Sequence, residues 1–251
     1  MELITHFHGR AADYDAARPA YAPAFFQYLS GTYGIADGAV IADIGSGTGK
    51  LSRQLLERGY QVFAVEPDRD MRSMAERNLA DFPGFFSVAG TAECTTLDSA
   101  SADAVIAAQS FHWFRPGAFR LECRRILRPG SIAVLVWNWR DPEASVNRAW
   151  SDLSRQFCPT FQGFSNGLRP HDPRISEFFG GCYQYHFFSH PLCLDWPAFL
   201  RRCLSSSYAP RGEAPESAAY QEALFSLFNR FARQGVLEIP NATVAYTGAP
   251  G

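Results

Sequence analysis

The first half of the chain alternates between short apolar runs and longer segments whose apolar residues recur at helical spacing. The runs are rich in Val, Ile, Ala and Phe, and we predict buried strands at 40–44, 60–66, 85–90, 103–108 and 132–139. Between them, apolar residues three or four positions apart predict helices at 50–58, 68–79 and 116–127. Strands that alternate with helices are typical of an α/β fold.

Turn and capping residues extend this pattern to the rest of the chain. Pro23 is a favourable first-turn residue and predicts a helix near the start. Asp195 predicts a helix as its N-cap, and Pro215 opens a longer helix that runs to Arg233. The other segments are expected to form a helix at 143–157, a loop at 158–174, strands at 183–188 and 191–194, and a closing β segment at 236–248.

A glycine-rich turn with the sequence VIADIGSGTG joins the first predicted strand to its helix at 40–49. Gly45, Gly47 and Gly49 let the backbone turn sharply and let a ligand lie against bare main chain. The second strand ends on Glu66, about twenty positions later, where a carboxylate can accept both hydroxyls of a ribose. The arrangement predicts a cofactor that contains a nucleoside.

Two cofactor classes fit this turn, and the glycine spacing separates them. A dinucleotide-binding turn has the pattern G-x-G-x-x-G, but Lys50 occupies the place of its third glycine. The stretch DIGSGTG instead resembles motif I of the class I S-adenosylmethionine (SAM) methyltransferases, and the sequence EPD at 66–68 follows at the distance of that family. An NAD-dependent oxidoreductase on a related fold is the alternative.

The resemblance covers roughly 14–140, over half of the chain. It includes the opening Y-D-x-x-R-P from Tyr14, the stretch Q-x-x-H-W-F from Gln109, and L-R-P-G before the last parallel strand. Within the class the chain looks most similar to the type-11 group, which includes trans-aconitate and ubiquinone/menaquinone-pathway methyltransferases. The resemblance implies a Rossmann-like seven-stranded sheet, mostly parallel with a C-terminal antiparallel hairpin, and helices on both faces.

The resemblance also implies one domain over residues 1–251. Its parts are an N-terminal cap at 1–30 that folds over SAM, a cofactor-binding core at 38–140, and a substrate-side insertion with closing strands at 141–251. SAM is the expected cofactor and S-adenosylhomocysteine its product. The residues expected to bind it are Tyr14, Arg18, Asp43, Gly45, Ser46, Gly47, Thr48, Gly49, Glu66, Pro67, Met71, Thr91, Ala92, Glu93, Gln109 and Ser110.

Two of these positions carry a qualification. Relatives often have an acidic residue where this chain has Thr91, so the adenine contact falls to the backbone at Ala92 or to Glu93. In the family, backbone around the position of Gln109 binds the methionine amino group.

His112 is the candidate catalytic base, because the fourth parallel strand should deliver it beside the reacting sulfur. The alternative is a histidine that shapes the pocket or bonds to backbone. Aromatic residues near the expected cleft favour a flat or apolar acceptor: Trp113, Trp137, Trp139, Phe161 and Phe164. Three arginines could bind a carboxylate acceptor, or could lie solvated on the surface: Arg140, Arg169 and Arg174.

Composition excludes several other classes of partner. The 251 residues carry a formal net charge of -2, so no basic excess favours a nucleic-acid substrate. The beginning lacks the pattern of a signal peptide, and no apolar run reaches membrane-spanning length. The six cysteines form no C-x-x-C pair, which predicts reduced thiols, no metal and a cytoplasmic location.

We therefore expect a SAM-dependent methyltransferase that methylates oxygen or carbon of a small molecule, with a carboxylate or a flat apolar molecule as the candidate acceptor. A SAM-binding protein without catalysis is the alternative from another class.

Overall fold

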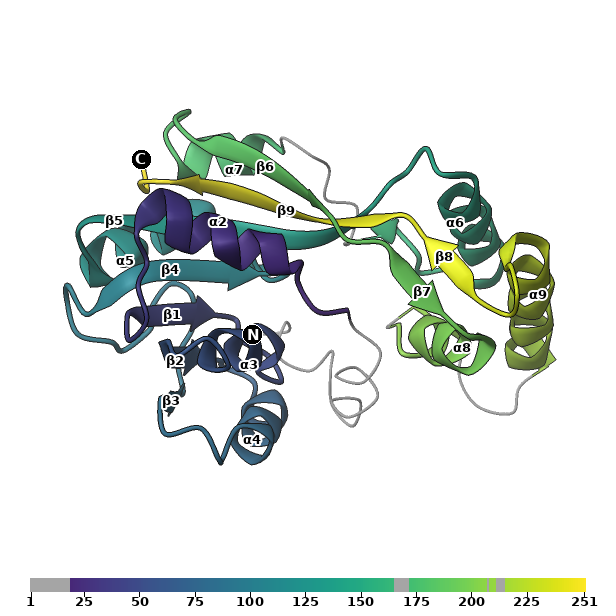
Figure 1. Ribbon diagram of the computed structural model, residues 1–251, viewed down its shortest axis with the longest axis horizontal. Helices are drawn as coiled ribbons and strands as arrows, with labels where there is room; N and C mark the ends of the chain where they lie inside the picture. The colour runs from purple at the N-terminus through teal and green to yellow at the C-terminus, as the bar shows by residue number, and fades with distance from the viewer. Residues whose placement is uncertain (1–18, 165–171, 207, 211–214) are drawn as a thin grey trace.

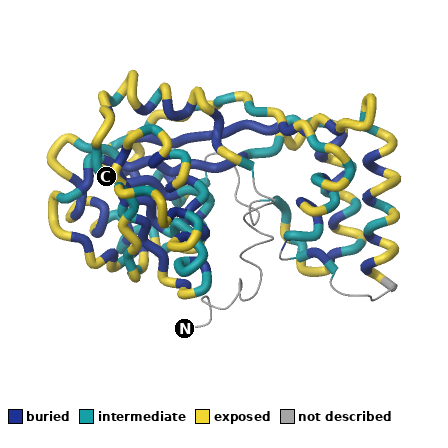
Figure 2. Tube along the Cα trace, turned by 60° about the horizontal axis from the view of Figure 1, so that its bottom comes forward, coloured by how far each residue is buried: buried dark blue, intermediate teal, exposed yellow. Residues whose placement is uncertain are grey.

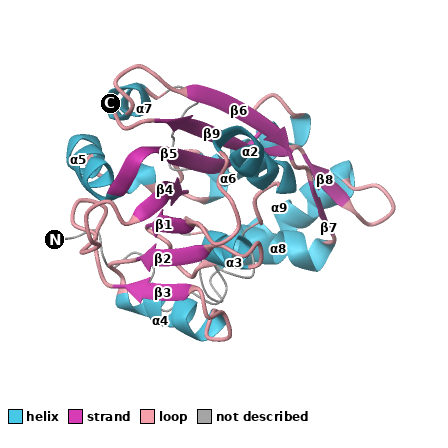
Figure 3. Ribbon diagram, turned by 60° about the vertical axis from the view of Figure 1, so that its left-hand side comes forward, coloured by secondary structure: helices cyan, strands magenta, loops and turns pink. Residues whose placement is uncertain are grey.

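The computed structural model describes residues 19–164, 172–206, 208–210 and 215–251. Its centre is a seven-stranded sheet in the order β3-β2-β1-β4-β5-β9-β6 (Figures 1 and 3). The strands are β1 (Val40–Ile44), β2 (Gln61–Val65), β3 (Phe85–Val88), β4 (Ala102–Ala108), β5 (Leu127–Arg140), β6 (Gln184–Ser189) and β9 (Asn241–Gly248). The first five pair in parallel, and β9 runs antiparallel to both β5 and β6. This confirms the predicted fold class.

Helices cover both faces of the sheet. One face packs against α5 (Pro116–Ile126) and α7 (Pro173–Phe178), and the other against α2 (Pro23–Tyr33) and α3 (Lys50–Leu56). Successive residues of β4 and β5 alternate between these two cores, so both strands are buried on both sides. Figure 2 shows buried residues running through the interior of the sheet and exposed residues on the turns around it. α4 (Arg69–Asn78) follows β2 where a helix was predicted at 68–79, and the Asp68 side chain caps it by accepting bonds from two backbone N–H groups.

A second lobe lies beside the sheet and has its own core (Figure 1). It is built from α6 (Ser145–Phe157), α8 (Trp196–Leu204), α9 (Pro215–Phe231) and a two-stranded sheet of β7 (Leu192–Leu194) and β8 (Leu237–Ile239). Aromatic side chains on three of these helices fill the core, with Trp150, Phe199 and Tyr220 completely buried. Asp195 caps α8 through the N–H of Ala198, as predicted.

One antiparallel ribbon connects the two lobes. β6 pairs with β9 in the sheet, and β7 pairs with β8 in the second lobe, in one continuous register. Proline residues interrupt the ribbon at Pro191 and Pro240, where a backbone N–H is missing. The expected C-terminal antiparallel pair is therefore present, but its two strands are separated in sequence by the second lobe instead of a short turn.

Three local expectations differ from the structure. The stretch L-R-P-G at 127–130, which precedes the predicted strand at 132–139, is the beginning of β5, and β5 pairs with β4 through a register shift between Ala102 and Ala104. The predicted loop at 158–174 ends earlier than expected, because Asp172 caps α7 through the N–H of Arg174. The closing β segment divides at Pro240 into β8 and β9.

Candidate functional site

The loops that follow β1, β2 and β4 meet at the carboxyl edge of the sheet. The strand order reverses between β1 and β4, and ligands of open α/β sheets bind at such a switch point. Backbone bonds join the loops: Gly45 and Ser46 donate their N–H groups to the Val65 carbonyl, at 2.9 and 3.2 Å. The Ser110 hydroxyl donates to the Ile44 carbonyl at 2.7 Å. Segments far apart in sequence are thereby held as one surface.

The three glycines of the turn all adopt left-handed backbone angles, with φ of 68° at Gly45, 57° at Gly47 and 83° at Gly49. A Cβ on Gly45 would lie 2.7 Å from Cβ of Ser110, and a Cβ on Gly49 would lie 2.6 Å from Cδ1 of Leu79. These two positions need glycine for packing. Around Gly47, by contrast, no described atom lies within 4 Å of the added Cβ, so its bare main chain faces open space.

Glu66 joins the glycine turn to the loop after β2. Its carboxylate accepts the N–H of Gly47 at 2.8 Å and the N–H of Asp68 at 2.9 Å, and only 8% of the residue is exposed. Burial raises the pKa of this carboxyl, while the two backbone bonds act in the opposite direction. Each carboxylate oxygen has a second lone pair for a further donor. Glu66 is therefore positioned to hold the turn and to accept hydroxyl groups of a ligand.

Beneath the turn lies a second, completely buried carboxyl group. Asp43 accepts a hydrogen bond from the Ser52 hydroxyl at 2.7 Å, and burial raises its pKa to about 7. Its Oδ1 atom and the Ser46 hydroxyl are buried and bond to no described residue. Thr48 is also buried in this turn. Unpaired buried oxygens are uncommon in folded proteins and frequently mark a binding site.

The segment after β3 is held by a buried carboxylate that the sequence analysis did not identify. Glu122 of α5 accepts the N–H of Thr95 at 2.7 Å and its hydroxyl at 2.5 Å, and pairs with Arg125. These bonds lower the pKa of Glu122 to about 2, with Arg125 the largest cause. No local motif predicts such a clamp, because its members lie 27 residues apart in the sequence.

Residues expected near adenine lie on the same segment, where Ala92 is buried and Thr91 is exposed. Two other expected cofactor contacts follow β2: Pro67 is exposed, and Met71, in α4, is 4% exposed. The Glu93 carboxylate accepts the N–H of Arg115 at 2.9 Å at the start of α5. Its side chain thus supports a helix N-terminus, and the backbone of this segment is the better candidate for an adenine contact.

The end of β4 is strained at Gln109. Its φ is 56°, in a region that non-glycine residues rarely occupy, and its N–H donates to the Val136 carbonyl at 2.9 Å. A left-handed residue of this kind costs on the order of 1–3 kcal/mol, and such residues cluster at functional sites. The bend directs the chain into η1 (Phe111–Trp113).

His112 lies on η1, and its Nδ1 atom is buried and bonds to no described residue. Burial and, to a smaller extent, the charge of Arg174 lower its pKa to about 4, so the imidazole is neutral at physiological pH. The adjacent Trp113 ring lies 4.8 Å from it and is 40% exposed. A neutral imidazole beside an exposed indole can accept a hydrogen bond from a ligand hydroxyl.

Most of the aromatic residues expected to face a cleft belong to the core of the sheet or to the core of the second lobe. Trp137 is 1% exposed and packs against Phe111 and Tyr246, which corrects the expectation for this residue. Trp139 is partly buried against the same sheet core, and Phe161 and Phe164 pack against the core of the second lobe.

The three candidate arginines have different environments. The Arg140 guanidinium lies between two rings, 4.3 Å from the centroid of Trp150 and 4.0 Å from that of Phe164. Arg174 forms a two-pronged pair with Asp172, at 2.9 and 3.0 Å. Arg169 lies outside the described residues, as do Tyr14 and Arg18 of the expected cofactor site.

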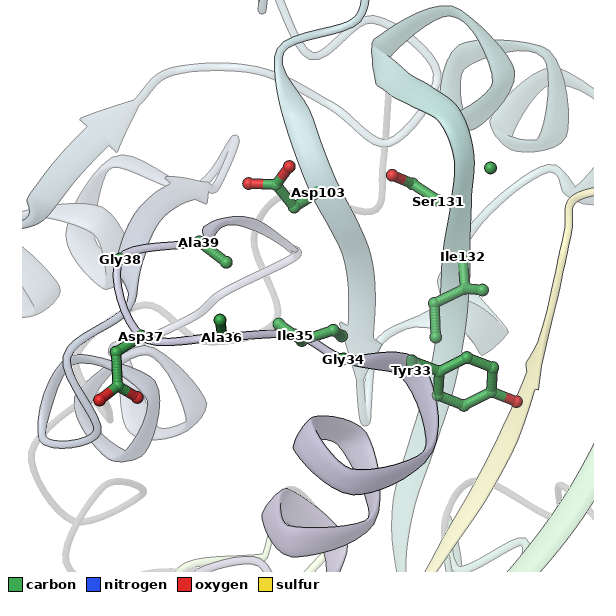
Figure 4. Close-up of a pocket in the computed structure, with 11 residues that line it drawn as sticks. Tyr33, Gly34, Ile35, Ala36, Asp37, Gly38, Ala39, Asp103, Ser131 and Ile132 are labelled. Carbon is green, nitrogen blue, oxygen red and sulfur yellow. The ribbon is translucent and has the colours of Figure 1, made fainter.

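A cavity of about 470 Å³ lies at the opposite edge of the sheet (Figure 4). Its walls come from the linker between α2 and β1, from Asp103 at the start of β4, and from 130–132 at the start of the core part of β5. Asp103 already pairs with Arg128 and accepts the N–H of Val40 at 2.8 Å. No residue of the glycine turn lines this cavity. It lies at the amino ends of β1, β4 and β5, opposite the loops that follow these strands.

Within the described part of the chain, no three His, Cys, Asp or Glu side chains are grouped so that they could hold a metal ion. No helix in the same residues is both long and apolar enough to cross a membrane.

Comparison with known sequences identifies part of the chain. Residues 42–135 match the family model of the methyltransferase domain. An uncharacterized methyltransferase of Mycobacterium tuberculosis is 39% identical over 140 residues, which are 56% of this chain and 55% of that protein. One from Schizosaccharomyces pombe is 32% identical over 136 residues, 54% of this chain and 52% of that protein. The chain thus spans about half the length of the curated relatives it matches.

Solved structures match over a larger share of the chain. A candidate type II methyltransferase from Anaeromyxobacter dehalogenans has a TM-score of 0.65 and 25% identity, covering 92% of this chain and 97% of its own. A SAM-dependent methyltransferase from Geobacter sulfurreducens, solved with S-adenosyl-L-homocysteine, has a TM-score of 0.51 and 15% identity, covering 96% and 97%. The latter likeness concerns the fold.

Proposed function

The chain carries a class I SAM-dependent methyltransferase domain of the type-11 group, and from this premise we propose that it transfers a methyl group from SAM to a small-molecule acceptor. The observation that carries the proposal is the Glu66 carboxylate, held against the N–H of Gly47 at the carboxyl edge of β2. This bond would combine an acid suited to binding ribose hydroxyls with a bare glycine turn in one unit. The acceptor class proposed is a carboxylate or a flat apolar molecule.

The residues of this edge suit the parts of SAM. Glu66 would bind the ribose hydroxyls, and the backbone at Ala92 would meet the adenine. The open main chain at Gly47 and the bent backbone at Gln109 would receive the methionine portion. Asp43 Oδ1 and Ser46 Oγ, which are buried and bond to no described residue, would supply further hydrogen-bond acceptors. When bound, SAM supplies an electrophilic methyl group on a sulfonium centre.

The protein's own task is then to hold an acceptor atom in line and to exclude water. Nδ1 of His112 would accept the hydrogen bond of an acceptor hydroxyl, and the exposed Trp113 ring would pack against a flat acceptor. Because the pKa of His112 is lowered to about 4, the imidazole is available as a hydrogen-bond acceptor across the neutral range. A carboxylate acceptor arrives ionised and would need no base.

A methyl-transfer screen with SAM labelled in the methyl group tests the proposal, with calorimetry of SAM, S-adenosylhomocysteine and NAD beside it. We expect both sulfur compounds to bind, NAD not to bind, and label to appear in one class of small acceptor. Tight binding of NAD without binding of SAM would favour the oxidoreductase alternative. Binding of SAM with no transfer across carboxylates, phenols and enols would favour the non-catalytic alternative.

A further inference from the structure

A cavity of about 240 Å³ lies where the antiparallel ribbon passes from the sheet into the second lobe (Figure 1). It is separate from the larger cavity of Figure 4, and no residue of the glycine turn lines it. Its walls contain two aromatic residues, Trp139 and Phe187, and two acidic residues, Asp141 and Glu238. The other described residues that line it are uncharged.

The strand register explains why this part of the sheet is hollow. Trp139 of β5 lies opposite Ala242 of β9, which in turn lies opposite Ser189 of β6. Residues directly opposite one another project from the same face, so these three form one row across the sheet. In the neighbouring row on that face, Val244 of β9 lies opposite Phe187 of β6. The small side chains of Ala242 and Ser189 therefore leave space beside the larger rings.

The acidic wall is held at the interruption of the ribbon by backbone bonds. The N–H of Asp141 donates to the Pro240 carbonyl at 3.2 Å, and the side-chain amide of Asn147 donates to the carbonyls of both residues, at 2.8 and 2.9 Å. Oδ1 of Asp141 accepts the N–H of Glu143 at 2.9 Å. The second acid, Glu238, is exposed on β8, whose neighbouring residues are buried in the second lobe. Both carboxylates thus extend from anchored backbone.

The described part of the chain supplies no positive charge to these two carboxylates. Its ion pairs include neither Asp141 nor Glu238. The Arg140 guanidinium, although adjacent in sequence, lies against the rings of Trp150 and Phe164 in the second lobe. A cation in the cavity would meet two negative charges and the electron-rich faces of aromatic rings, and both attract it.

We propose that this cavity binds a small organic ammonium ion, with its charge beside Asp141 and Glu238 and its carbon groups against Trp139 and Phe187. Two carboxylates with two rings suit such an ion better than a metal ion, because calcium and magnesium need six or more oxygen ligands. The volume is below the roughly 300–1,000 Å³ of drug-sized sites, so the ligand is small. The inference does not depend on the proposed function, since no expected cofactor residue lines the cavity.

The exposed positions of the site can be changed without disturbing either core, and each change has a matched control. Asp141→Asn and Glu238→Gln remove a charge and keep the shape of the side chain. Phe187→Leu removes a ring that is 59% exposed. Asp152→Asn is the control for charge, because Asp152 is an exposed acid of α6 that does not line the cavity. Phe225→Leu is the control for the ring, because Phe225 is 46% exposed and lies outside the cavity.

Calorimetry with choline tests the proposal, with dimethylbutanol, in which carbon replaces the charged nitrogen, as the uncharged comparison. Choline should bind in the millimolar range, the alcohol should not bind, and added salt should weaken the binding of choline. Asp141→Asn, Glu238→Gln and Phe187→Leu should each weaken choline binding at least threefold. Asp152→Asn and Phe225→Leu should leave it unchanged.

Three results would overturn the ammonium site: no binding of choline, equal binding of the uncharged alcohol, or equal losses in the control variants. Affinity for S-adenosylhomocysteine, measured on the same proteins, should be the same in all five variants as in the wild type. A wild type that binds choline but neither SAM nor its product would overturn the proposed function and leave the ammonium site standing, so the two failures are distinguishable.

Discussion

The two lobes of this protein are held together in different ways. In the sheet lobe, loops from separate strands are joined by specific polar contacts, such as Glu66 with the turn and Ser110 with the end of β1. In the second lobe, a cluster of aromatic and aliphatic side chains provides the core, and its helices carry no cofactor motif. The match to the methyltransferase domain ends at residue 135, before the second lobe begins. The sheet lobe therefore depends on the exact positions of its polar groups, whereas the second lobe depends on the packing of its apolar side chains.

The ribbon between the lobes links these two kinds of structure. β6–β9 and β7–β8 share one register, so one ribbon runs from the sheet into the second lobe and is interrupted only at Pro191 and Pro240. The side-chain amide of Asn147, in the second lobe, donates to the carbonyl of Pro240 at this interruption. Variants confined to one lobe therefore test how far the lobes act independently.

The largest effect is expected for Trp150→Ala in the core of the second lobe. Removing a completely buried indole should lower the free energy of unfolding by about 3–5 kcal/mol. Affinity for S-adenosylhomocysteine should stay within twofold, whereas Trp137→Ala in the sheet core should lower stability and affinity together. Denaturant titration and calorimetry measure the two quantities. A tenfold loss of affinity in Trp150→Ala would show that the lobes are not independent.

Asp43→Asn should stabilise the protein at neutral pH. The folded-state pKa of Asp43 is raised to about 7, so the native state keeps a proton that the unfolded chain releases near pH 4. The native state is thus penalised as pH rises, and the wild type should lose on the order of 3 kcal/mol relative to the variant between pH 5 and 7.

Urea denaturation of both proteins at pH 5, 6 and 8 measures this difference, with Ser52→Ala as the control that keeps the carboxyl group. The stability difference between wild type and Asp43→Asn should grow with pH. A difference that does not change over this range would show that Asp43 is already ionised in the folded protein.

Gly47→Val should weaken SAM binding at least a hundredfold with little effect on packing. The added side chain meets no described atom of the protein, but it occupies the open face of the turn and disfavours a φ of 57°. Circular dichroism should remain native while calorimetry detects no binding. Gly130→Val is a matched control, because Gly130 also has a left-handed φ, 82°, and its added Cβ also meets nothing within 4 Å among described residues. Normal SAM affinity in Gly47→Val would show that this glycine shapes the turn and does not contact SAM.

His112→Ala should lower turnover about a hundredfold if the imidazole acts on an acceptor hydroxyl, with SAM affinity unchanged. Its pKa of about 4 places the ionisation below the neutral range, so the wild-type rate should be constant between pH 6 and 8 and fall as pH drops toward 4. The variant His112→Gln tests whether His112 acts as a base or only shapes the acceptor site. If that variant keeps most of its turnover, His112 forms a wall of the acceptor site and is not a base.

Glu66→Ala should weaken SAM binding at least tenfold, because hydrogen bonds to a charged group contribute about 1.5–3 kcal/mol each. Glu66→Gln should lose less, since the amide oxygen can still accept the N–H of Gly47. Unchanged affinity in a natively folded Glu66→Ala protein would remove the ribose assignment.

The parallel half of the fold was predictable because its signals are local. Short apolar runs identify the five parallel strands, and Asp68 marks the start of α4 through bonds that span only a few positions. The same local signal, at Asp195, marks the start of α8 in the second lobe. The left-handed turn at Gly45, Gly47 and Gly49 follows from the one residue type that adopts such angles without strain.

Other features depended on contacts that no local pattern contains. The aromatic residue Trp137 was expected near a cleft, but the alternation of β5 directs it into the sheet core. The start of α7 follows a Gly- and Pro-rich stretch that conceals its cap at Asp172. The second lobe forms because four separate segments bury one aromatic cluster together, which no single segment predicts.

The sequence by itself determined where the five parallel strands lie along the chain, the glycine turn and the acid that faces it. Only the tertiary structure decided the protonation of Asp43 and His112, because burial sets their pKa values and burial depends on the whole fold. The same holds for Asn138, whose partners lie 119, 118 and 105 residues away in the chain. A side-chain amide has donors and acceptors in every context, and the surrounding fold decides which backbone groups it holds.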